Sequence, residues 1–384
     1  MLYCIPKIRK LNRKNNIMLT KIEITNFKSF NEKFTFDLSN TNEFKFNEEC
    51  IQNGIVNTGI IYGQNGCGKS NLGFALFDLI SHLTDRTTEE VFYKNYLNAN
   101  NSADKAQFRF TFRLDGIEAI YEYSKKDYQT LVSEKLTIDN KLFASIDRNK
   151  STLFEVHAEG TESLTTDVGD SNISILSYIS KNSILVDNQT NNVFKKFKSF
   201  INKMLFFRNI DDRCYMGFEQ GSHSIAHNIV KLGNLKEFEN LLNDAGIKCK
   251  LNSKEVNGEY QIYFVFNNRE IEFHSIASSG TKALALFYFW YQVKQDISFL
   301  FIDEFDAFYH HGLSRIIIEK LKETRGTQVI LTTHNTSIIS NDLLRPDCYF
   351  LMDEEKIRPL TKCTDRELRE GHNIEKMYRA NSFG

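Results

Sequence analysis

A segment near the start of the chain carries the residue types needed to hold a polyphosphate. It reads Gly63-Gln64-Asn65-Gly66-Cys67-Gly68-Lys69-Ser70 and fits the pattern G-x-x-x-x-G-K-[ST]. In this pattern, backbone N–H groups and the lysine face the β- and γ-phosphates, while the serine holds Mg²⁺. An apolar strand is expected at 55–62, and leucines at helical spacing predict a helix over 71–83. Strand, loop and helix in that order are the context that the pattern requires.

A second segment supplies the acidic groups that such a site needs. Phe299-Leu300-Phe301-Ile302-Asp303-Glu304 is an apolar strand that ends in two carboxylates. On its own, an acidic pair at a strand end is often only a solvated end. Together with the phosphate loop, it indicates a nucleoside triphosphatase.

Two further segments have residues suited to phosphate chemistry. Ala277-Ser278-Ser279-Gly280-Thr281 is a small-residue turn before a helix expected at 281–295, so it is either a second anion site or only a good helix cap. Leu331-Thr332-Thr333-His334 ends a strand expected at 327–333.

The order of these four segments resembles the ATP-binding cassette (ABC) superfamily. Within it, the match is to the SMC/RecF/OLD branch. The resemblance rests on Ile24-Thr25-Asn26-Phe27-Lys28-Ser29-Phe30 as the opening strand, on Asn71 directly after the phosphate loop, and on Asp303-Glu304-Phe305-Asp306 with His311. It covers roughly 18–83 and 259–350. It implies an α/β fold: an ABC-type ATPase head with a mixed sheet flanked by helices.

The same resemblance assigns roles residue by residue. Lys69 would neutralise the β- and γ-phosphates, and Ser70 with Asp303 would hold Mg²⁺. Glu304 and His334 would act on the attacking water and the γ-phosphate as catalytic residues. Nucleotide contacts are implied for the loop from Gly63 to Asn71, for Ser278, Ser279 and Gly280 of a second subunit, and for Asp306, which would link two sites.

Two assignments stay open at this point. Lys28 either touches phosphate or ribose or is a surface lysine. The glutamine that the superfamily places near the metal could be Gln107 or Gln129.

Four regions are expected along the chain. Residues 1–17 form a basic extension, and either Met1 or Met18 could be the natural start. Residues 18–150 form the first half of the head, including strands at 107–113, 118–124 and 131–145 with turns at Asp115-Gly116 and Asp139-Asn140. Residues 151–258 form a mainly helical insertion, with helical periodicity over 192–245 that includes Met204. Residues 259–384 form the second half.

Composition limits the remaining possibilities. The 48 basic and 49 acidic residues nearly cancel, so any nucleic-acid surface must be local. Seven cysteines without C-x-x-C spacing fit a reducing, cytoplasmic setting, and no apolar run is long enough for a membrane span.

His223, His227 and Cys214 make only a weak zinc candidate. The run Lys195-Lys196-Phe197-Lys198 with Lys203 and Arg208 reads either as a solvated helix face with buried phenylalanines or as a surface that tracks nucleic-acid phosphates.

The middle region and the tail narrow the resemblance further. Residues 84–258 are too short for the SMC coiled coil, and the residues after His334 cannot hold a TOPRIM domain. The chain is therefore similar to compact ATPases of anti-phage systems, such as the AriA subunit of PARIS and the AbiL ATPase, which have tails like that at 371–380.

This resemblance implies an oligomer with shared ATP sites and a separate effector of the TOPRIM nuclease type, responding to a phage trigger. A RecF-like DNA-repair ATPase is the alternative. A transporter ATPase is disfavoured, since the middle region lacks a compact helical subdomain.

Overall fold

The computed structural model describes residues 17–86, 90–208, 215–217, 224–307, 309, 311–324 and 326–383. The predicted basic extension therefore lies outside the described residues, apart from Ile17. His223 and Cys214 of the weak zinc candidate also lie outside them. Within the described residues, the strands form two seven-stranded sheets, one three-stranded sheet and the short hairpin β3 (Ile51–Gln52) and β4 (Ile55–Val56).

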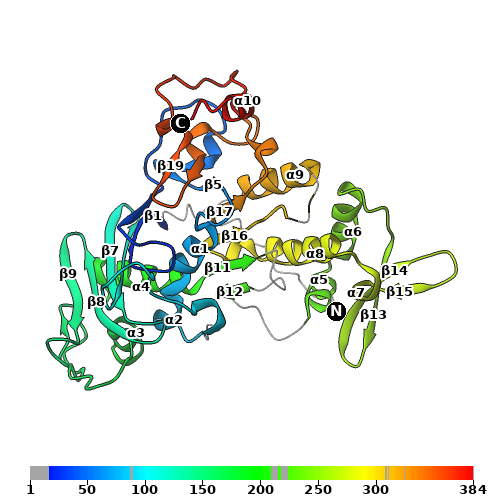
Figure 1. The fold of residues 1–384 in the computed structure, drawn as a ribbon. Helices are drawn as coiled ribbons and strands as arrows, with labels where there is room; N and C mark the ends of the chain where they lie inside the picture. Colours follow the sequence, from blue (N-terminus) through cyan, green and yellow to red (C-terminus); the bar gives the residue numbers. More distant parts are fainter. Residues whose placement is uncertain are drawn as a thin grey trace.

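The central sheet has the order β12-β11-β16-β17-β5-β18-β19 (Figure 1). Its parallel strands are β11 (Met204–Arg208), β16 (Phe299–Asp303), β17 (Gln328–Thr333), β5 (Thr58–Gly63) and β18 (Tyr349–Met352). The edge strands β12 (Tyr215–Gly217) and β19 (Ile357–Pro359) are antiparallel to their neighbours. All residues of β16 and β17 are buried, as expected for parallel strands covered on both faces. This mixed sheet flanked by helices is the α/β head predicted from the sequence.

The strand β11 corrects one prediction. Met204 was expected in a helix, but helix α4 (Gln189–Asn202) ends before it, and Met204 begins a strand that pairs with β16. The run of four apolar residues at 204–207 is short, and it suits a strand buried inside a sheet. Residues 204–208 are thus part of the central sheet rather than of an insertion.

The rest of the segment 151–258 mixes helices and strands. The elements are β10 (Glu155–Val156), α3 (Ile175–Asn182), α5 (Ile225–Lys231), α6 (Leu235–Asp244) and β13 (Leu251–Val256).

The second large sheet is antiparallel, with the order β10-β9-β8-β7-β6-β1-β2. Its main strands are β1 (Ile17–Thr25), β2 (Phe34–Asp37), β6 (Ala106–Leu114), β7 (Ile117–Lys125), β8 (Leu131–Ile138) and β9 (Lys141–Asp147). The predicted turns are confirmed: Asp115, Gly116, Asp139 and Asn140 all have positive φ, as two-residue hairpin turns require. Helix α4 packs against β6, β7 and β8 and covers one face of this sheet (Figure 1).

The basic and aromatic run lies mainly on α4. Phe197 is buried against Phe112 and Tyr121, and the Lys198 ammonium donates to the Leu83 carbonyl. Lys196 pairs with Asp115. These contacts favour a helix face with buried phenylalanines over a phosphate-tracking surface.

The buried side chain of Gln328 links the two large sheets by hydrogen bonds. Gln328, at the start of β17, accepts from the Leu19 N–H at 3.0 Å and donates to the carbonyls of Leu19 and Val56, both at 2.9 Å. Because all three partners are backbone groups, this amide fixes β1 against β17.

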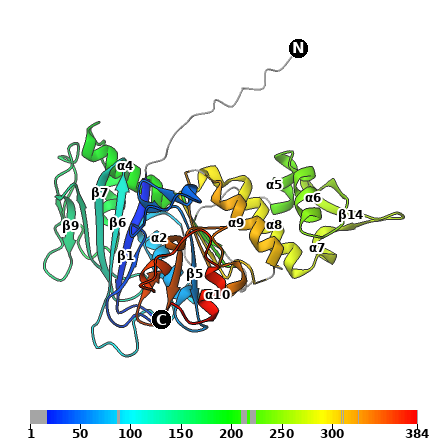
Figure 2. The ribbon, with the colours of Figure 1, turned by 90° about the horizontal axis from the view of Figure 1, so that it is seen from above.

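Several helices and a small sheet lie on the side of the central sheet away from the antiparallel sheet (Figure 2). Helix α8 (Ser279–Gln292) packs against α5 and α6. The small sheet combines β13 with β14 (Glu259–Val265) and β15 (Glu270–Glu272), and α7 (Phe273–Ile276) follows.

The remaining described α-helices are α1 (Lys69–Asp78), α2 (Ile80–Leu83), α9 (His311–Lys322) and α10 (Ile374–Arg379). None of the described helices has the length and apolar character to cross a membrane.

A buried ion pair connects α1 to the antiparallel sheet. The Lys125 ammonium lies 3.0 Å from Asp78 Oδ2, and both side chains have no exposed surface. The Tyr123 hydroxyl donates to the same oxygen at 2.9 Å, and Lys125 donates to Ser81 Oγ at 2.7 Å. Burial lowers the pKa of Lys125, while the charge of Asp78 opposes that shift.

Replacing Asp78 is therefore expected to destabilise the fold strongly. Asp78→Asn leaves the Lys125 charge buried without its counterion, which costs about 3–5 kcal/mol. Urea unfolding measures this loss. The exposed pair of Asp85 and Lys181 supplies the control, because Asp85→Asn should cost no more than about 1 kcal/mol. If Asp78→Asn lowered the free energy of unfolding by no more than about 1 kcal/mol, the result would contradict a buried ion pair.

Candidate nucleotide site

The phosphate loop lies between β5 and α1, and its backbone admits little but glycine. Gly66 and Gly68 have φ of 85° and 102°, a region that L side chains rarely adopt. A Cβ at Gly63 would lie 2.5 Å from Cys67 Sγ and 2.6 Å from the Met352 carbonyl oxygen. Gln64 and Asn65 are exposed at the tip of the loop. The loop is therefore a concave backbone surface at the start of a helix, which is suited to an anion.

The side chain of Lys69 hydrogen-bonds to the backbone of this loop. Its ammonium is buried and donates to the carbonyls of Gly63 at 2.8 Å and Gln64 at 3.0 Å. Burial lowers the pKa of Lys69, and the nearby groups of Cys67, Asp303 and Glu304 oppose that shift. The ammonium also donates to Cys67 Sγ at 4.0 Å. Since none of these partners is a charged oxygen, the ammonium fits the phosphates of ATP, which would offer it charged oxygens instead.

Asp303 ends β16 directly opposite the start of α1. Its Oδ2 accepts from Ser70 Oγ at 2.6 Å, and its Oδ1 accepts from Thr332 Oγ1 at 2.7 Å. The guanidinium of Arg208 lies close as well, with Nε 3.5 Å from Oδ2. A serine hydroxyl and a carboxylate in contact are hard oxygen ligands, so these two side chains fit Mg²⁺.

Glu304 and His334 lie at the more open part of the site. The Nε2 atom of His334 is 3.7 Å from Oε1 of Glu304, and the two side chains are 37% and 27% exposed. Glu304 has a φ of 48°, which is unusual for this residue type, and its N–H donates to Thr332 Oγ1 at 2.8 Å. Thr332 thus fixes both acidic residues of the strand end.

Asp306 is held by the end of β17, and Asn71 by the segment after β1. Thr333 Oγ1 donates to Asp306 Oδ1 at 2.6 Å, and burial raises the pKa of Asp306. The Asn71 amide donates to Ser29 Oγ at 2.9 Å, so it joins α1 to the segment after β1.

Lys28 lies near the same helix. It has a φ of 48°, and its ammonium donates to the Lys94 carbonyl at 3.1 Å and lies 5.2 Å from the centre of the Phe74 ring. Burial lowers the pKa of Lys28 to about 8; the charge of Asp78 raises it, and that of Arg208 lowers it further. Lys28 is therefore a partly buried lysine beside the phosphate-loop helix, not a freely solvated surface one.

The small-residue turn lies elsewhere in the molecule. Ser278 caps α8, with its Oγ accepting from the Thr281 N–H at 3.1 Å. Ser278 and Ser279 are exposed, and Gly280 is partly exposed. This end of α8 adjoins α7 and the small sheet, well away from α1 (Figures 1 and 2). Within one chain, the phosphate loop lies together with Asp303, Glu304 and His334. The turn at Ser278 lies apart from them.

Neither of the two candidate glutamines lies at the site. Gln107 lies on β6 and Gln129 in the turn between β7 and β8, so both belong to the antiparallel sheet. Arg208 lies beside Asp303 instead, at the end of β11. Neither the proximity of Arg208 to Asp303 nor the hydrogen bonds of Thr332 with Asp303 and Glu304 were predicted from the sequence. The only sequence feature that could have indicated the position of Arg208 is that it ends an apolar run, as Asp303 does.

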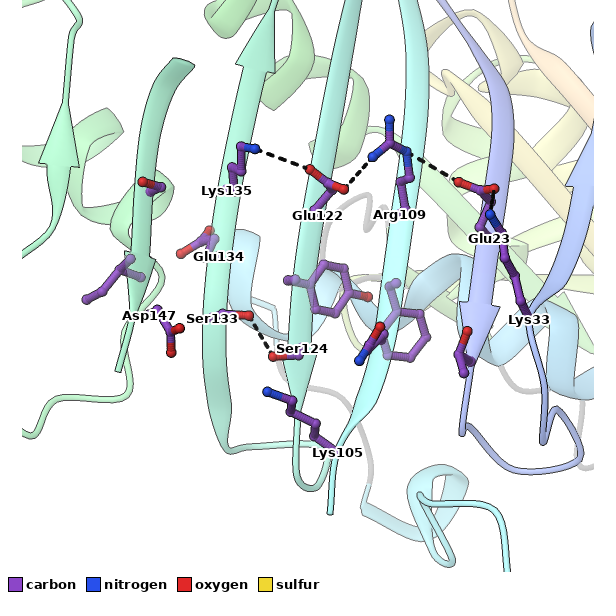
Figure 3. Close-up of a pocket in the computed structure, with 16 residues that line it drawn as sticks. Glu23, Lys33, Lys105, Arg109, Glu122, Ser124, Ser133, Glu134, Lys135 and Asp147 are labelled. Carbon is purple, nitrogen blue, oxygen red and sulfur yellow. Dashed lines mark hydrogen bonds and ion pairs between the residues drawn. The ribbon is translucent and has the colours of Figure 1, made fainter. Parts of the chain in front are cut away.

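A separate cavity of about 490 Å³ lies on the face of the antiparallel sheet opposite α4. Figure 3 shows charged side chains that alternate across neighbouring strands here, in the order Lys135, Glu122, Arg109, Glu23 and Lys33. Because these groups neutralise one another, this surface offers no strong charge to a ligand.

The fold and the site together define a P-loop ATPase. The phosphate loop joins β5 to α1, and the acidic end of β16 lies against it. Residues 60–340 match the family described as "AAA domain, putative AbiEii toxin, Type IV TA system", and the chain belongs to this family. Binding of ATP is expected of its members.

Other comparisons give weaker similarities. No curated protein matches the sequence. An SMC head bound to the C-winged helix domain of ScpA shares 17% identity at a TM-score of 0.43, covering 88% of this chain and 96% of that one. An SMC head from Thermotoga maritima shares 15% identity at a TM-score of 0.40, covering 89% and 98%. A Pyrococcus furiosus complex of an SMC head and the C-terminal domain of ScpA shares 14% at 0.42, covering 89% and 96%.

Proposed function

We propose that the protein hydrolyses ATP with Mg²⁺ at this site. The observation that carries the proposal is the contact of Ser70 with Asp303 inside a loop closed by Lys69. Lys69 and the loop amides from Gly63 to Asn71 bind the β- and γ-phosphates. Ser70 and Asp303 hold Mg²⁺, which when bound neutralises charge on the phosphates.

Glu304 and His334 carry the chemical step in this proposal. Glu304 orients the attacking water and accepts its proton, since its carboxylate lies at the open part of the site beside Asp303. His334, 3.7 Å away, donates a hydrogen bond toward the γ-phosphate and keeps Glu304 in place.

We further propose that two copies of the chain share each nucleotide site, as in the ABC superfamily. Ser278 and Ser279 are exposed and Gly280 is partly exposed at the start of a helix, where free N–H groups favour an anion. In one chain they are far from the phosphate loop. A second copy placed head to tail would supply them, and Asp306 would then link the two sites.

The biological role that fits these features is defence against phage. The family description names a putative toxin of a toxin–antitoxin system. We propose that the chain is the ATP-dependent sensor and scaffold, similar to AriA or AbiL, and that a separately encoded effector, such as a TOPRIM nuclease, acts with it when a phage product binds.

A phage-challenge assay tests this role. Cells carrying the locus are expected to survive infection, and Lys69→Ala should remove the protection while the exposed Lys45→Ala keeps it. Equal protection by wild type and Lys69→Ala would exclude the nucleotide site from the mechanism. Absence of protection by the wild-type locus would contradict the defence role, and tight, ATP-dependent, salt-sensitive duplex binding would support the RecF-like alternative.

A further inference from the structure

The contact between Arg208 and Asp303 has no role in the function proposed above. Strands β11 and β16 are parallel neighbours, and Arg208 is directly opposite Asp303 in their register. Its Nε lies 3.5 Å from Oδ2, the oxygen that also accepts from Ser70 Oγ at 2.6 Å. The guanidinium therefore faces the same carboxylate oxygen as the serine assigned to the metal.

The guanidinium is held in this place. Its central carbon lies 5.4 Å from the centre of the Phe74 ring on α1, and the Arg208 side chain is 19% exposed. Asp303 is 3% exposed, so little water screens the pair. An arginine keeps its charge at any physiological pH. A fixed positive charge thus lies beside the acidic strand end, in addition to the charge of Lys69.

We infer that Arg208 is a positioning residue that takes the place of the metal's charge at Asp303 whenever Mg²⁺ is not bound. The inference rests on the proposed role of Asp303 as a metal ligand. Two consequences follow from simple electrostatics. The guanidinium competes with a divalent cation for Asp303, and it lowers the repulsion between Asp303 and the phosphates of a nucleotide that binds without metal.

Arg208→Gln separates these two consequences, because it removes the charge and keeps a polar side chain. Titration of Mn²⁺ alone, followed by electron paramagnetic resonance, is expected to show at least about fivefold tighter binding in the variant. Titration of a fluorescent ATP analogue in EDTA is expected to show at least about fivefold weaker binding. Local damage to the site would weaken both, so the opposite signs are diagnostic of the charge.

Arg113→Gln on β6 is the matched control, since Arg113 is exposed and lies in the other large sheet; neither titration should change. If Arg208→Gln does not fold, Arg208→Met keeps the apolar stem over Phe74 and should give the same two shifts. Unchanged or jointly weakened binding in the folded variant would overturn the inference. Asp303→Asn tests the underlying assignment: if it leaves Mn²⁺ binding intact, the proposed metal ligand is wrong, whatever Arg208 does.

Discussion

Replacement of Lys69 by alanine is expected to abolish nucleotide binding. The ammonium is buried inside the phosphate loop, and its present partners are the carbonyls of Gly63 and Gln64 and the Sγ atom of Cys67. Phosphate oxygens would replace them with charge-assisted hydrogen bonds. Loss of these bonds should weaken binding of a fluorescent ATP analogue at least about 100-fold, which corresponds to about 2.7 kcal/mol.

The control for this experiment is Lys45→Ala, which removes an exposed lysine and should leave the affinity unchanged. Thermal unfolding without nucleotide distinguishes loss of the ligand from loss of the fold. A Lys69→Ala variant that remains folded and binds within about threefold of the wild type would refute the assignment of the loop.

Replacement of Glu304 by glutamine should stop hydrolysis and preserve binding. The substitution keeps the size and hydrogen bonding of the side chain but removes the base, so the hydrolysis rate should fall about 10²- to 10⁴-fold. Since Lys69, Ser70 and Asp303 are untouched, ATP should still bind. Under the shared-site proposal, the ATP-bound oligomer then accumulates and is detected by size-exclusion chromatography.

Two comparisons make this result interpretable. Glu354→Gln, in the exposed turn between β18 and β19, should hydrolyse ATP at the wild-type rate. Adding Ser278→Arg to Glu304→Gln should prevent the oligomer from forming, because a large side chain would occupy the helix start. If Glu304→Gln hydrolyses normally, the base is another residue; if it binds ATP but stays monomeric, the shared site is wrong.

The sequence predicted those parts of the fold and of the site that have local signals. The loop from Gly63 to Ser70 is a continuous pattern, and the hairpin turn at Asp115-Gly116 depends only on its own residues. Asp303 and Glu304 could be placed because an apolar strand precedes them. Each of these features is decided within about ten residues, which is the range that periodicity and turn chemistry cover.

The parts that were missed depend on contacts between distant segments. Met204 could be assigned to a helix or a strand from its neighbours, and pairing with β16 decided it. The same pairing places Arg208 against Asp303, and no short pattern records that register. Gln107 was a reasonable candidate by residue type, yet its strand belongs to the other large sheet.

The separation of the Ser278 turn from the phosphate loop has a consequence for dosage. If each complete site needs two molecules, the number of sites depends on protein concentration by mass action. At low occupancy, halving the amount of protein would lower the number of complete sites about fourfold. A cell could then hold the protein inactive simply by keeping it scarce, and a modest rise in expression would act as a steep trigger.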